Sequence, residues 1–361
     1  MRVTDVFGLD LEVLDRTLLL GAPGIGKTAV IEQYARKKAV ELKRKFVDLK
    51  KDQNLEKVLK EPEKYFTYLR IIATHIFPED CSIPRENGSY LVFKSPLTLK
   101  VLEKTKGIVF IDEINNVKRE DQRVLFYSMI QEKEIGWNLK LSDEQVIIAA
   151  GNPPEYSADA SDLPNPLLNR MTVLEVDPPT IDEWIQYMKR FNHDTRVDAY
   201  LKFNEAEEGG GAFLRIPEEP EGLENFPSPR SWTNLAVKLY KIKDEKIIPH
   251  IAAGCIGKEE AGKFVAFMRT NVPTVEELLY KPQLWDSLDL QGKYLISTAI
   301  ANKIDSLIKN SRFDKLLGKM ENEFIILTVK LVPIDKRIYV LKNTTLAQIV
   351  KELAKELKDF L

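Results

Sequence analysis

A glycine-rich octapeptide near the start of the chain has the residue types of a phosphate-binding loop. Residues 21–28 read GAPGIGKT, which is the pattern G-x-x-x-x-G-K-S/T. The apolar run Leu18–Leu20 precedes it, and a stretch without glycine or proline follows from Thr28 to about Lys45. A strand, a loop and a helix in this order let backbone N–H groups and a helix N-terminus surround an anion. The octapeptide therefore predicts a nucleoside triphosphate site.

The loop also predicts which of its side chains contact the ligand. Lys27 is expected to reach the β- and γ-phosphates, and the Thr28 hydroxyl is expected to ligate Mg²⁺. The alternative is a glycine-rich turn without a ligand, which the flanking segments and the later motifs disfavour. The remaining nucleotide contacts are predicted at Gly21, Ala22, Pro23, Gly24, Ile25, Gly26 and Ala29.

An apolar run that ends in two carboxylates predicts the metal-binding and catalytic part of the site. Ile108–Ile111 is followed directly by Asp112 and Glu113. Ligands gather at the carboxyl ends of parallel strands, so Asp112 is predicted near Thr28, on the metal ion. Glu113 is predicted near the γ-phosphate, where it could polarise an attacking water. A strand that ends in a solvated acidic turn is the alternative, and the preceding phosphate loop weighs against it.

A second apolar run, Val146–Ala150, leads through Gly151 to Asn152. An asparagine at this place can orient the attacking water or contact the γ-phosphate without adding charge. An isolated asparagine before two prolines is more typical of a turn, and the order of the motifs favours the functional role. Arg170 and Arg230 are candidates for stabilising the charge of a transferring phosphate. Taken singly, each arginine is more often a solvated ion-pair partner.

The elements around these motifs predict the fold. Residues 1–178 alternate strand-like and helix-like stretches, which indicates an α/β core with a parallel sheet and covering helices. Residues 40–64 are expected to add helical material, and Ser89–Phe93 and Ile135–Leu141 are expected to form hairpin arms. Five core strands are predicted, at Leu18–Leu20, Phe66–Ala73, Ile108–Ile111, Val146–Ala150 and Met171–Val176.

A helical lid is predicted over residues 179–310, because strand signals fade after Asp177–Pro178–Pro179. Thr180 and Glu183 have the spacing of a capping box at the start of its first helix. Glu321–Val340 is apolar enough for either a strand or a helix. Further helices are expected from Ser231, from about Asp244, from Lys258 and from Gln291. Residues 311–361 form a predicted C-terminal extension that ends in an amphipathic helix, with Leu346, Ile349, Val350, Leu353 and Leu357 on one face.

Composition limits the partners and the compartment. The 361 residues are 44% hydrophobic and 30% charged, with a net charge of −2, so a nucleic-acid partner is not expected. No apolar run approaches the roughly 20 residues that span a bilayer, and no membrane segment or signal peptide is expected. Cys81 and Cys255 are isolated in the sequence, which favours reduced thiols and a cytoplasmic location.

Taken in order, the motifs resemble those of AAA+ ATPases, and among these the MoxR group. The similarity covers about residues 17–270. The resembling stretches are GAPGIGKT (Walker A), IVFIDEINN (Walker B), IIAAGNPPE (sensor 1), LLNRM at the arginine finger and FPSPRSW at the sensor-2 arginine. The stretches FPEDCSIP, LEVDPPTIDEW and HIAAGCIGKEEAGKFVAFMR are also similar to MoxR-like proteins.

The resemblance implies ATP and Mg²⁺ as ligands and a role for each residue. Lys27 and Thr28 would grip the phosphates and Mg²⁺, Asp112 would coordinate the metal, Glu113 would be the catalytic base and Asn152 would be sensor 1.

The resemblance also implies an assembly. Arg170 would act in trans on a neighbouring subunit's nucleotide, and Arg230 would act in cis from the lid. Family members form rings, typically hexamers, that use ATP hydrolysis to remodel or activate a protein partner. The usual partner of MoxR-like proteins carries a von Willebrand factor A domain.

Two other function classes remain as alternatives. A DNA-directed motor, such as a helicase loader or a restriction-linked translocase, would need a basic stripe, and the Glu134–Leu141 hairpin offers only Lys140. A nucleotide-gated scaffold with little turnover is disfavoured by the presence of Asp112, Glu113, Asn152 and Arg170. The resemblance leaves the adenine contacts and the role of the residues after about 310 unassigned.

Overall fold

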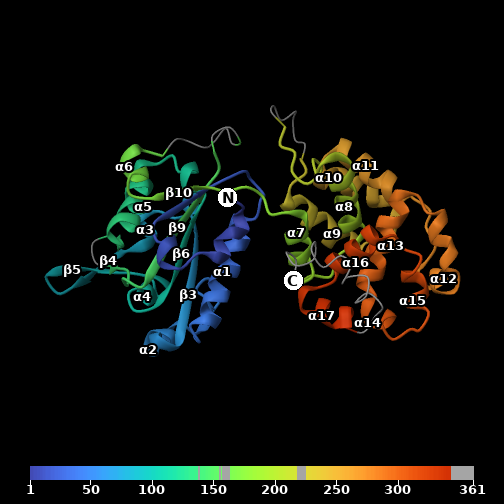
Figure 1. The fold of residues 1–361 in the computed structure, drawn as a ribbon. Helices are drawn as coiled ribbons and strands as arrows, with labels where there is room; N and C mark the ends of the chain where they lie inside the picture. The colour runs from blue at the N-terminus through green and yellow to red at the C-terminus, as the bar shows by residue number, and fades with distance from the viewer. Residues whose placement is uncertain (137–138, 154–155, 157–162, 218–224, 343–361) are drawn as a thin grey trace. The chain divides into compact units, whose positions relative to one another are not determined.

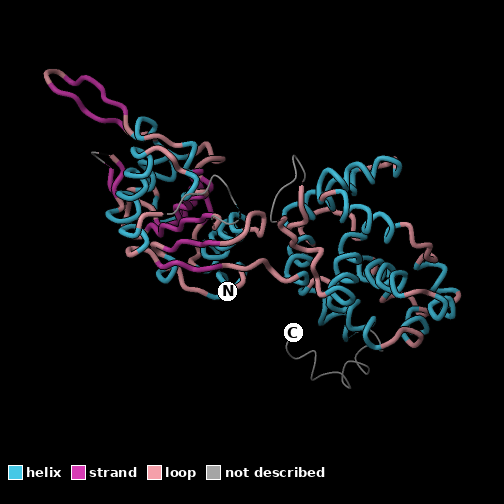
Figure 2. The backbone as a smooth tube through the Cα atoms, turned by 90° about the horizontal axis from the view of Figure 1, so that it is seen from above, coloured by secondary structure: helices cyan, strands magenta, loops and turns pink. Residues whose placement is uncertain are grey.

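The computed structural model describes residues 1–136, 139–153, 156, 163–217 and 225–342 (Figure 1). The chain divides into two compact units, Met1–Pro179 and Thr180–Leu361. The first unit is α/β, and the described part of the second is helical (Figure 2). The boundaries predicted for the lid and the C-terminal extension remain predictions.

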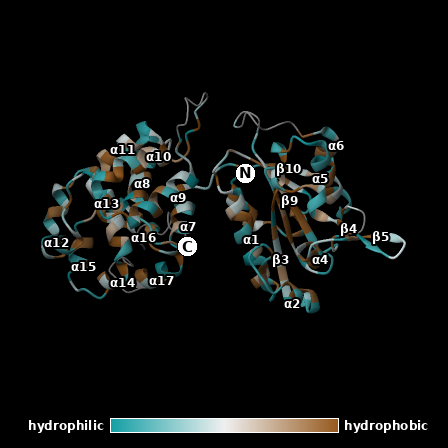
Figure 3. Cartoon of the chain, turned by 180° about the vertical axis from the view of Figure 1, so that it is seen from behind, coloured by the Kyte–Doolittle hydropathy of each residue, from teal (hydrophilic) through white to brown (hydrophobic). Residues whose placement is uncertain are grey.

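A six-stranded sheet of parallel strands forms the centre of the first unit, in the order β10-β1-β9-β6-β3-β2. All seven residues of β9 are buried, as is β6 from Gly107 onward, because helices cover both faces of the sheet. Figure 3 shows how hydrophobic these central strands are. The strands are β1 (Thr17–Leu20), β2 (Lys45–Asp48), β3 (Tyr65–Ile72), β6 (Lys106–Asp112), β9 (Gln145–Gly151) and β10 (Thr172–Glu175).

Helix α1 covers one face of this sheet, and α4 and α5 cover the other (Figures 1 and 3). Val109 and Ile111 of β6 pack with Phe126 and Ile130 of α5 in one buried cluster. The α/β fold with a parallel sheet is therefore confirmed. The helices of this unit are α1 (Lys27–Glu41), α2 (Leu55–Lys60), α3 (Pro78–Cys81), α4 (Leu97–Leu102), α5 (Glu120–Glu132) and α6 (Asn165–Leu168).

Residues 40–64 contain helical material, as expected, and also a strand that was not predicted. This segment contains strand β2, which extends the sheet by pairing in parallel with β3, in addition to helix α2. The strand was missed because it lies at the edge of the sheet, is only four residues long and has charged ends. Among its residues only Val47 is buried, so its apolar pattern is too short to distinguish a strand.

Two hairpins lie outside the main sheet, where the sequence predicts hairpin arms. Strands β4 (Ile83–Asn87) and β5 (Tyr90–Lys94) pair antiparallel and extend well away from the body of the unit (Figures 1 and 2). We call residues 83–94 the projecting hairpin; every β4 residue in it is exposed. Strands β7 (Glu134–Ile135) and β8 (Leu139–Lys140) form the second, shorter hairpin.

The second unit is built from helices around a buried aromatic core that includes Trp232 and Trp285. The predicted capping box opens it: the Thr180 N–H donates to Glu183 Oε2 over 2.8 Å, and the Glu183 N–H donates to Thr180 Oγ1 over 3.2 Å. Its helices are α7 (Ile181–Met188), α8 (Arg196–Glu208), α9 (Pro229–Lys241), α10 (Ile248–Ile256), α11 (Lys258–Met268), α12 (Val275–Tyr280), α13 (Leu290–Asn302), α14 (Ile304–Leu307), α15 (Phe313–Leu317), α16 (Asn322–Leu331) and α17 (Ile334–Lys342).

The ambiguous stretch Glu321–Val340 is helical, as α16 and α17. The predicted amphipathic helix over Leu346–Leu357 lies outside the described residues. Cys81 in the first unit and Cys255 in the second are both buried, unpaired thiols. Within the described ranges, none of the helices has the length and apolar character needed to span a bilayer.

Candidate active site

The sheet brings three of the predicted motifs to one edge. Strand β1 ends at Leu20, which pairs with Gly151 of β9, and Ile111 of β6 pairs with Ala149 of β9. Because these strands are parallel and neighbouring, the residues that follow them emerge on the same side. The phosphate loop, Asp112 and Asn152 are therefore adjacent.

The conformation of the loop explains its glycines. Gly24 and Gly26 have φ angles of 79° and 100°, in the region that favours glycine. A Cβ atom on Gly21 would lie 2.3 Å from the carbonyl oxygen of Val176. Gly26 is the N-cap of α1 and has no side chain to occupy the helix N-terminus, so the N–H groups of the first turn, including Ala29, can face an anion.

The Lys27 ammonium connects the loop to Asn152. Its Nζ donates to the carbonyl oxygens of Gly21 over 2.6 Å and Ala22 over 3.0 Å, and to Asn152 Oδ1 over 2.9 Å. Only 8% of Lys27 is exposed, so its charge is held beside the loop in a partly desolvated environment. The two residues that sequence reasoning assigns to the γ-phosphate side of the site are thus in direct contact.

Asp112 and Thr28 form the second contact between motifs. Thr28 Oγ1 donates to Asp112 Oδ2 over 2.8 Å. Arg70 of β3 also donates to this oxygen, from Nε over 3.0 Å and from Nη2 over 2.7 Å. Sequence reasoning missed Arg70, although a single charged residue within the apolar stretch Tyr65–Ile72 is a signal that could have indicated it.

The residues at this edge fit a Mg²⁺ ion. A hydroxyl and a carboxylate 2.8 Å apart are hard oxygen ligands, the type that Mg²⁺ prefers. Mg²⁺ usually takes only one or two protein oxygens and completes its shell with water and substrate phosphates. The described residues contain no group of three or more His, Cys, Asp or Glu side chains that could hold a metal ion.

Glu113 and Asn115 lie in the turn that follows β6. Glu113 is exposed and has φ 59° and ψ 37°, a left-handed conformation that is uncommon outside glycine. Asn115 is 3% exposed, and its amide bonds the backbone of Asn152: Nδ2 donates to the Asn152 carbonyl, and the Asn152 N–H donates to Asn115 Oδ1 over 3.3 Å. Sequence reasoning did not single out Asn115.

The two predicted arginines take part in none of the contacts described so far. Arg170 is exposed and precedes β10, whose first residue Thr172 pairs with Thr17. The loop follows the C-terminal end of β1, whereas Arg170 precedes the N-terminal end of β10. Arg170 and the loop of its own subunit therefore lie toward opposite ends of the parallel strands. Arg230 is an exposed residue in the first turn of α9, in the second unit.

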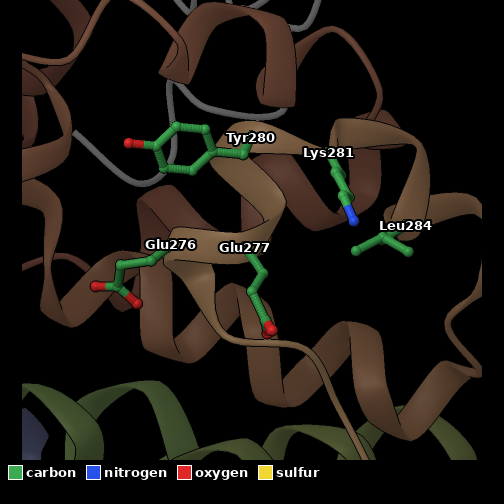
Figure 4. Close-up of a pocket in the computed structure, with 5 residues that line it drawn as sticks. All are labelled: Glu276, Glu277, Tyr280, Lys281 and Leu284. Carbon is green, nitrogen blue, oxygen red and sulfur yellow. The ribbon is translucent and has the colours of Figure 1, made fainter.

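A separate hollow in the second unit offers no comparable chemistry. It encloses about 300 Å³ and is lined by α12 and the turn after it (Figure 4). Of its carboxylates, Glu276 pairs with Lys303 over 2.7 Å, and Glu277 accepts from the Thr274 N–H over 2.7 Å as part of the helix cap. Both carboxylates are therefore engaged in structural contacts.

Comparison with known proteins finds a family similar to the first unit. Residues 17–176 match the model of the ATPase family associated with various cellular activities (AAA). These residues, which make up most of the first unit, are therefore similar to the AAA domains of ATPases. The matched range contains the loop, Asp112, Glu113 and Asn152.

Solved structures similar to the chain include a candidate ATPase from Cytophaga hutchinsonii, with 10% identity and a TM-score of 0.32, which covers 98% of this chain and 78% of that one. Another is NtrX from Brucella abortus in complex with ATP, with 14% identity and a TM-score of 0.34; the match covers 91% of this chain and 66% of NtrX. A search of curated proteins finds no significant match. The similarity to AAA ATPases rests on the match over residues 17–176.

Proposed function

We propose that this protein is a MoxR-like AAA ATPase, that it hydrolyses Mg·ATP between the subunits of a ring, and that hydrolysis remodels or activates a protein partner.

 The catalytic unit in this proposal is the interface between two neighbouring subunits, and the ring is a hexamer of this chain. The contacts that carry the proposal are Lys27 with Asn152 and Thr28 with Asp112, because they join three separate motifs at one edge of the sheet.

The chain's own residues would divide the reaction as follows. Lys27 would hold the β- and γ-phosphates, while Thr28 and Asp112 would hold Mg²⁺, which would neutralise charge on the transferring phosphoryl group. Glu113 would accept a proton from the attacking water as its oxygen bonds to the γ-phosphorus. The bond from that phosphorus to the β–γ bridging oxygen would break, and ADP and phosphate would leave. Asn152 would orient the water.

Arginine placement supports catalysis between subunits. Arg170 is exposed and lies toward the N-terminal ends of the parallel strands, whereas its own phosphate loop lies at their C-terminal ends. In a ring it would therefore contact the nucleotide of a neighbouring subunit. Arg230 would act in cis from the helical unit. The resemblance to MoxR-like proteins supports a protein partner with a von Willebrand factor A domain, and the two buried, unpaired cysteines support a cytoplasmic location.

The test is the substitution Glu113→Gln, which keeps the size of the side chain and removes its ability to take a proton. We expect steady-state phosphate release to fall by about 10²-fold or more, because general-base catalysis contributes about 10²–10⁴-fold. The affinity for Mg·ATP, measured by titration with a fluorescent nucleotide, should stay within about threefold of the wild type. Glu134→Gln, on the exposed part of β7, is the matched control. Wild-type turnover in Glu113→Gln would show that another group is the base.

A further inference from the structure

We propose that Asn115 is a positioning residue for hydrolysis: its side-chain amide holds the backbone of Asn152 and so sets where the Asn152 side chain lies. The inference rests on the proposed hydrolytic role of this site. Asn115 would touch neither ATP nor the attacking water, and its effect would pass entirely through Asn152.

The Asn115 amide links the segments that follow β6 and β9, beyond the point where these two strands stop pairing. The β6–β9 ladder ends with Ile111 opposite Ala149. Past that point, Asn115 Nδ2 donates to the Asn152 carbonyl and the Asn152 N–H donates to Asn115 Oδ1. One side chain thus satisfies both backbone groups of residue 152, as a neighbouring strand would.

The pairing requires an asparagine at residue 115. Its amide supplies a donor and an acceptor on a short side chain, whereas aspartate lacks the donor and an aliphatic residue lacks both. Because Asn115 is only 3% exposed, water cannot easily replace the lost bonds.

The approach of the amide also requires a glycine at residue 151. A Cβ atom there would lie 2.6 Å from Asn115 Oδ1 and 2.9 Å from its Cγ. These atoms belong to the end of one side chain, so an alanine at 151 would displace the Asn115 amide rather than the surrounding backbone. Gly151 is therefore explained by the space that the Asn115 amide occupies.

Asn152 passes this constraint on to the phosphate loop. Its Oδ1 accepts a hydrogen bond from Lys27 Nζ over 2.9 Å, so Asn115, Asn152 and Lys27 form a continuous chain of contacts. Glu113 lies in the same turn as Asn115. The amide therefore ties the turn that carries the proposed base to the residue that would orient the water.

A double-mutant cycle with Asn115→Ala, Gly151→Ala and the double variant tests the inference. We expect Asn115→Ala to lower kcat by about 10- to 100-fold, since small misplacements of catalytic groups have effects of this size. The dissociation constant of Mg·ATP should change by less than about threefold. Gly151→Ala should cause a similar loss of kcat in the wild type and less than about twofold further loss in the Asn115→Ala background, where no amide remains to be displaced.

Thermal unfolding of the same four proteins without nucleotide gives a readout that does not need turnover. Gly151→Ala should lower Tm in the wild type and leave it nearly unchanged in the Asn115→Ala background. Matched controls are Gly8→Ala, where a Cβ meets no atom within 4 Å, and Asn54→Ala at an exposed position. Additive effects on Tm would show that the amide and residue 151 do not interact, and would overturn the inference.

The outcomes separate this inference from the proposed function. If the wild type releases phosphate and Glu113→Gln does not, but Asn115→Ala keeps the wild-type kcat, the positioning role is wrong and the proposed function stands. A large loss of Mg·ATP affinity in Asn115→Ala would likewise overturn it, because it would indicate a direct role in binding. If the wild type itself releases no phosphate, the proposed hydrolysis and the positioning role both fail, and the Tm cycle reports only on the contact. Should Asn115→Ala fail to fold, the kcat of Gly151→Ala decides, since this variant keeps the asparagine.

Discussion

Asp112 accepts hydrogen bonds from two side chains through one oxygen atom. Its Oδ2 accepts hydrogen bonds from the Thr28 hydroxyl of α1 and from the guanidinium of Arg70 in β3. The carboxylate is almost fully buried, with a side-chain exposure of 9%, whereas Arg70 is 40% exposed. A buried carboxylate needs a compensating charge, and Arg70 supplies it across the neighbouring strand.

Replacing Arg70 with methionine tests this view. We expect Arg70→Met to lower the free energy of unfolding by about 1–3 kcal/mol, because it leaves a buried carboxylate without its charged partner. The loss should be clearly smaller in an Asp112→Asn background, where no charge needs compensation. Urea denaturation of the four proteins measures both values. Lys64→Met, which breaks the exposed pair with Glu61, should change stability by less than about 1 kcal/mol. An equal loss in both backgrounds would contradict the pairing argument.

Arg70 and Asn115 also mark the limit of what could be predicted for the site. The motif residues Lys27, Thr28 and Asp112 are identified by types and spacing along the chain, and their closeness follows from parallel strands. Arg70 acts on a residue 42 positions away, and Asn115 on one 37 positions away. Such partners are decided by strand order and register, which a single sequence does not specify.

Among the elements, the same reasoning separates what was predictable from what was not. Strands β1, β3, β6, β9 and β10 are predicted to within a few residues, because buried parallel strands are apolar runs bounded by polar residues. Strand β2 is missed because an edge position requires little apolar surface. In Phe324–Leu331 the periodicity cannot distinguish strand from helix, because α16 is buried on most sides and its apolar residues do not form a narrow stripe. Helix α8 has no counterpart among the predicted helices.

The projecting hairpin gives a prediction at this scale. Its apolar residues Tyr90 and Leu91 are each 61% exposed, so they contribute little to the core of the first unit. Replacing residues 84–93 with a short Gly-Ser turn should change the free energy of unfolding by less than about 1 kcal/mol. Binding of Mg·ATP should be unchanged, because no residue of the hairpin contacts the site motifs in the contacts described above. Titration with a fluorescent nucleotide and urea denaturation check both points, and loss of nucleotide binding would mean that the hairpin supports the site.

For the whole molecule, the proposed ring makes catalysis depend on pairs of subunits. Arg170→Ala and Glu113→Gln should each be inactive alone. A mixture should regain activity, because an Arg170→Ala subunit contributes its own Glu113 while its Glu113→Gln neighbour contributes Arg170. In an equal random mixture about a quarter of the interfaces would be intact. Phosphate release measured across mixing ratios tests this.

The matched control is a mixture of Arg170→Ala with a subunit that carries both substitutions. No interface in that mixture has both groups, so its activity should remain at the level of the single variants. Absence of recovery in the first mixture at every ratio would contradict catalysis between subunits. Recovery in the control would point to a group other than Arg170 acting across the interface, because no subunit in that mixture carries Arg170.

The positions of the two cysteines have a practical consequence. Each compact unit holds one, and both are buried. Thiols react as thiolates, and burial raises the pKa of the Cys81 thiol to about 11, so alkylation at neutral pH is slow while the first unit stays closed. Labelling kinetics followed by mass spectrometry would therefore report the local opening of each unit separately. The labelling rates of Cys81 and Cys255 can therefore distinguish stabilisation of the first unit by nucleotide from stabilisation of the second.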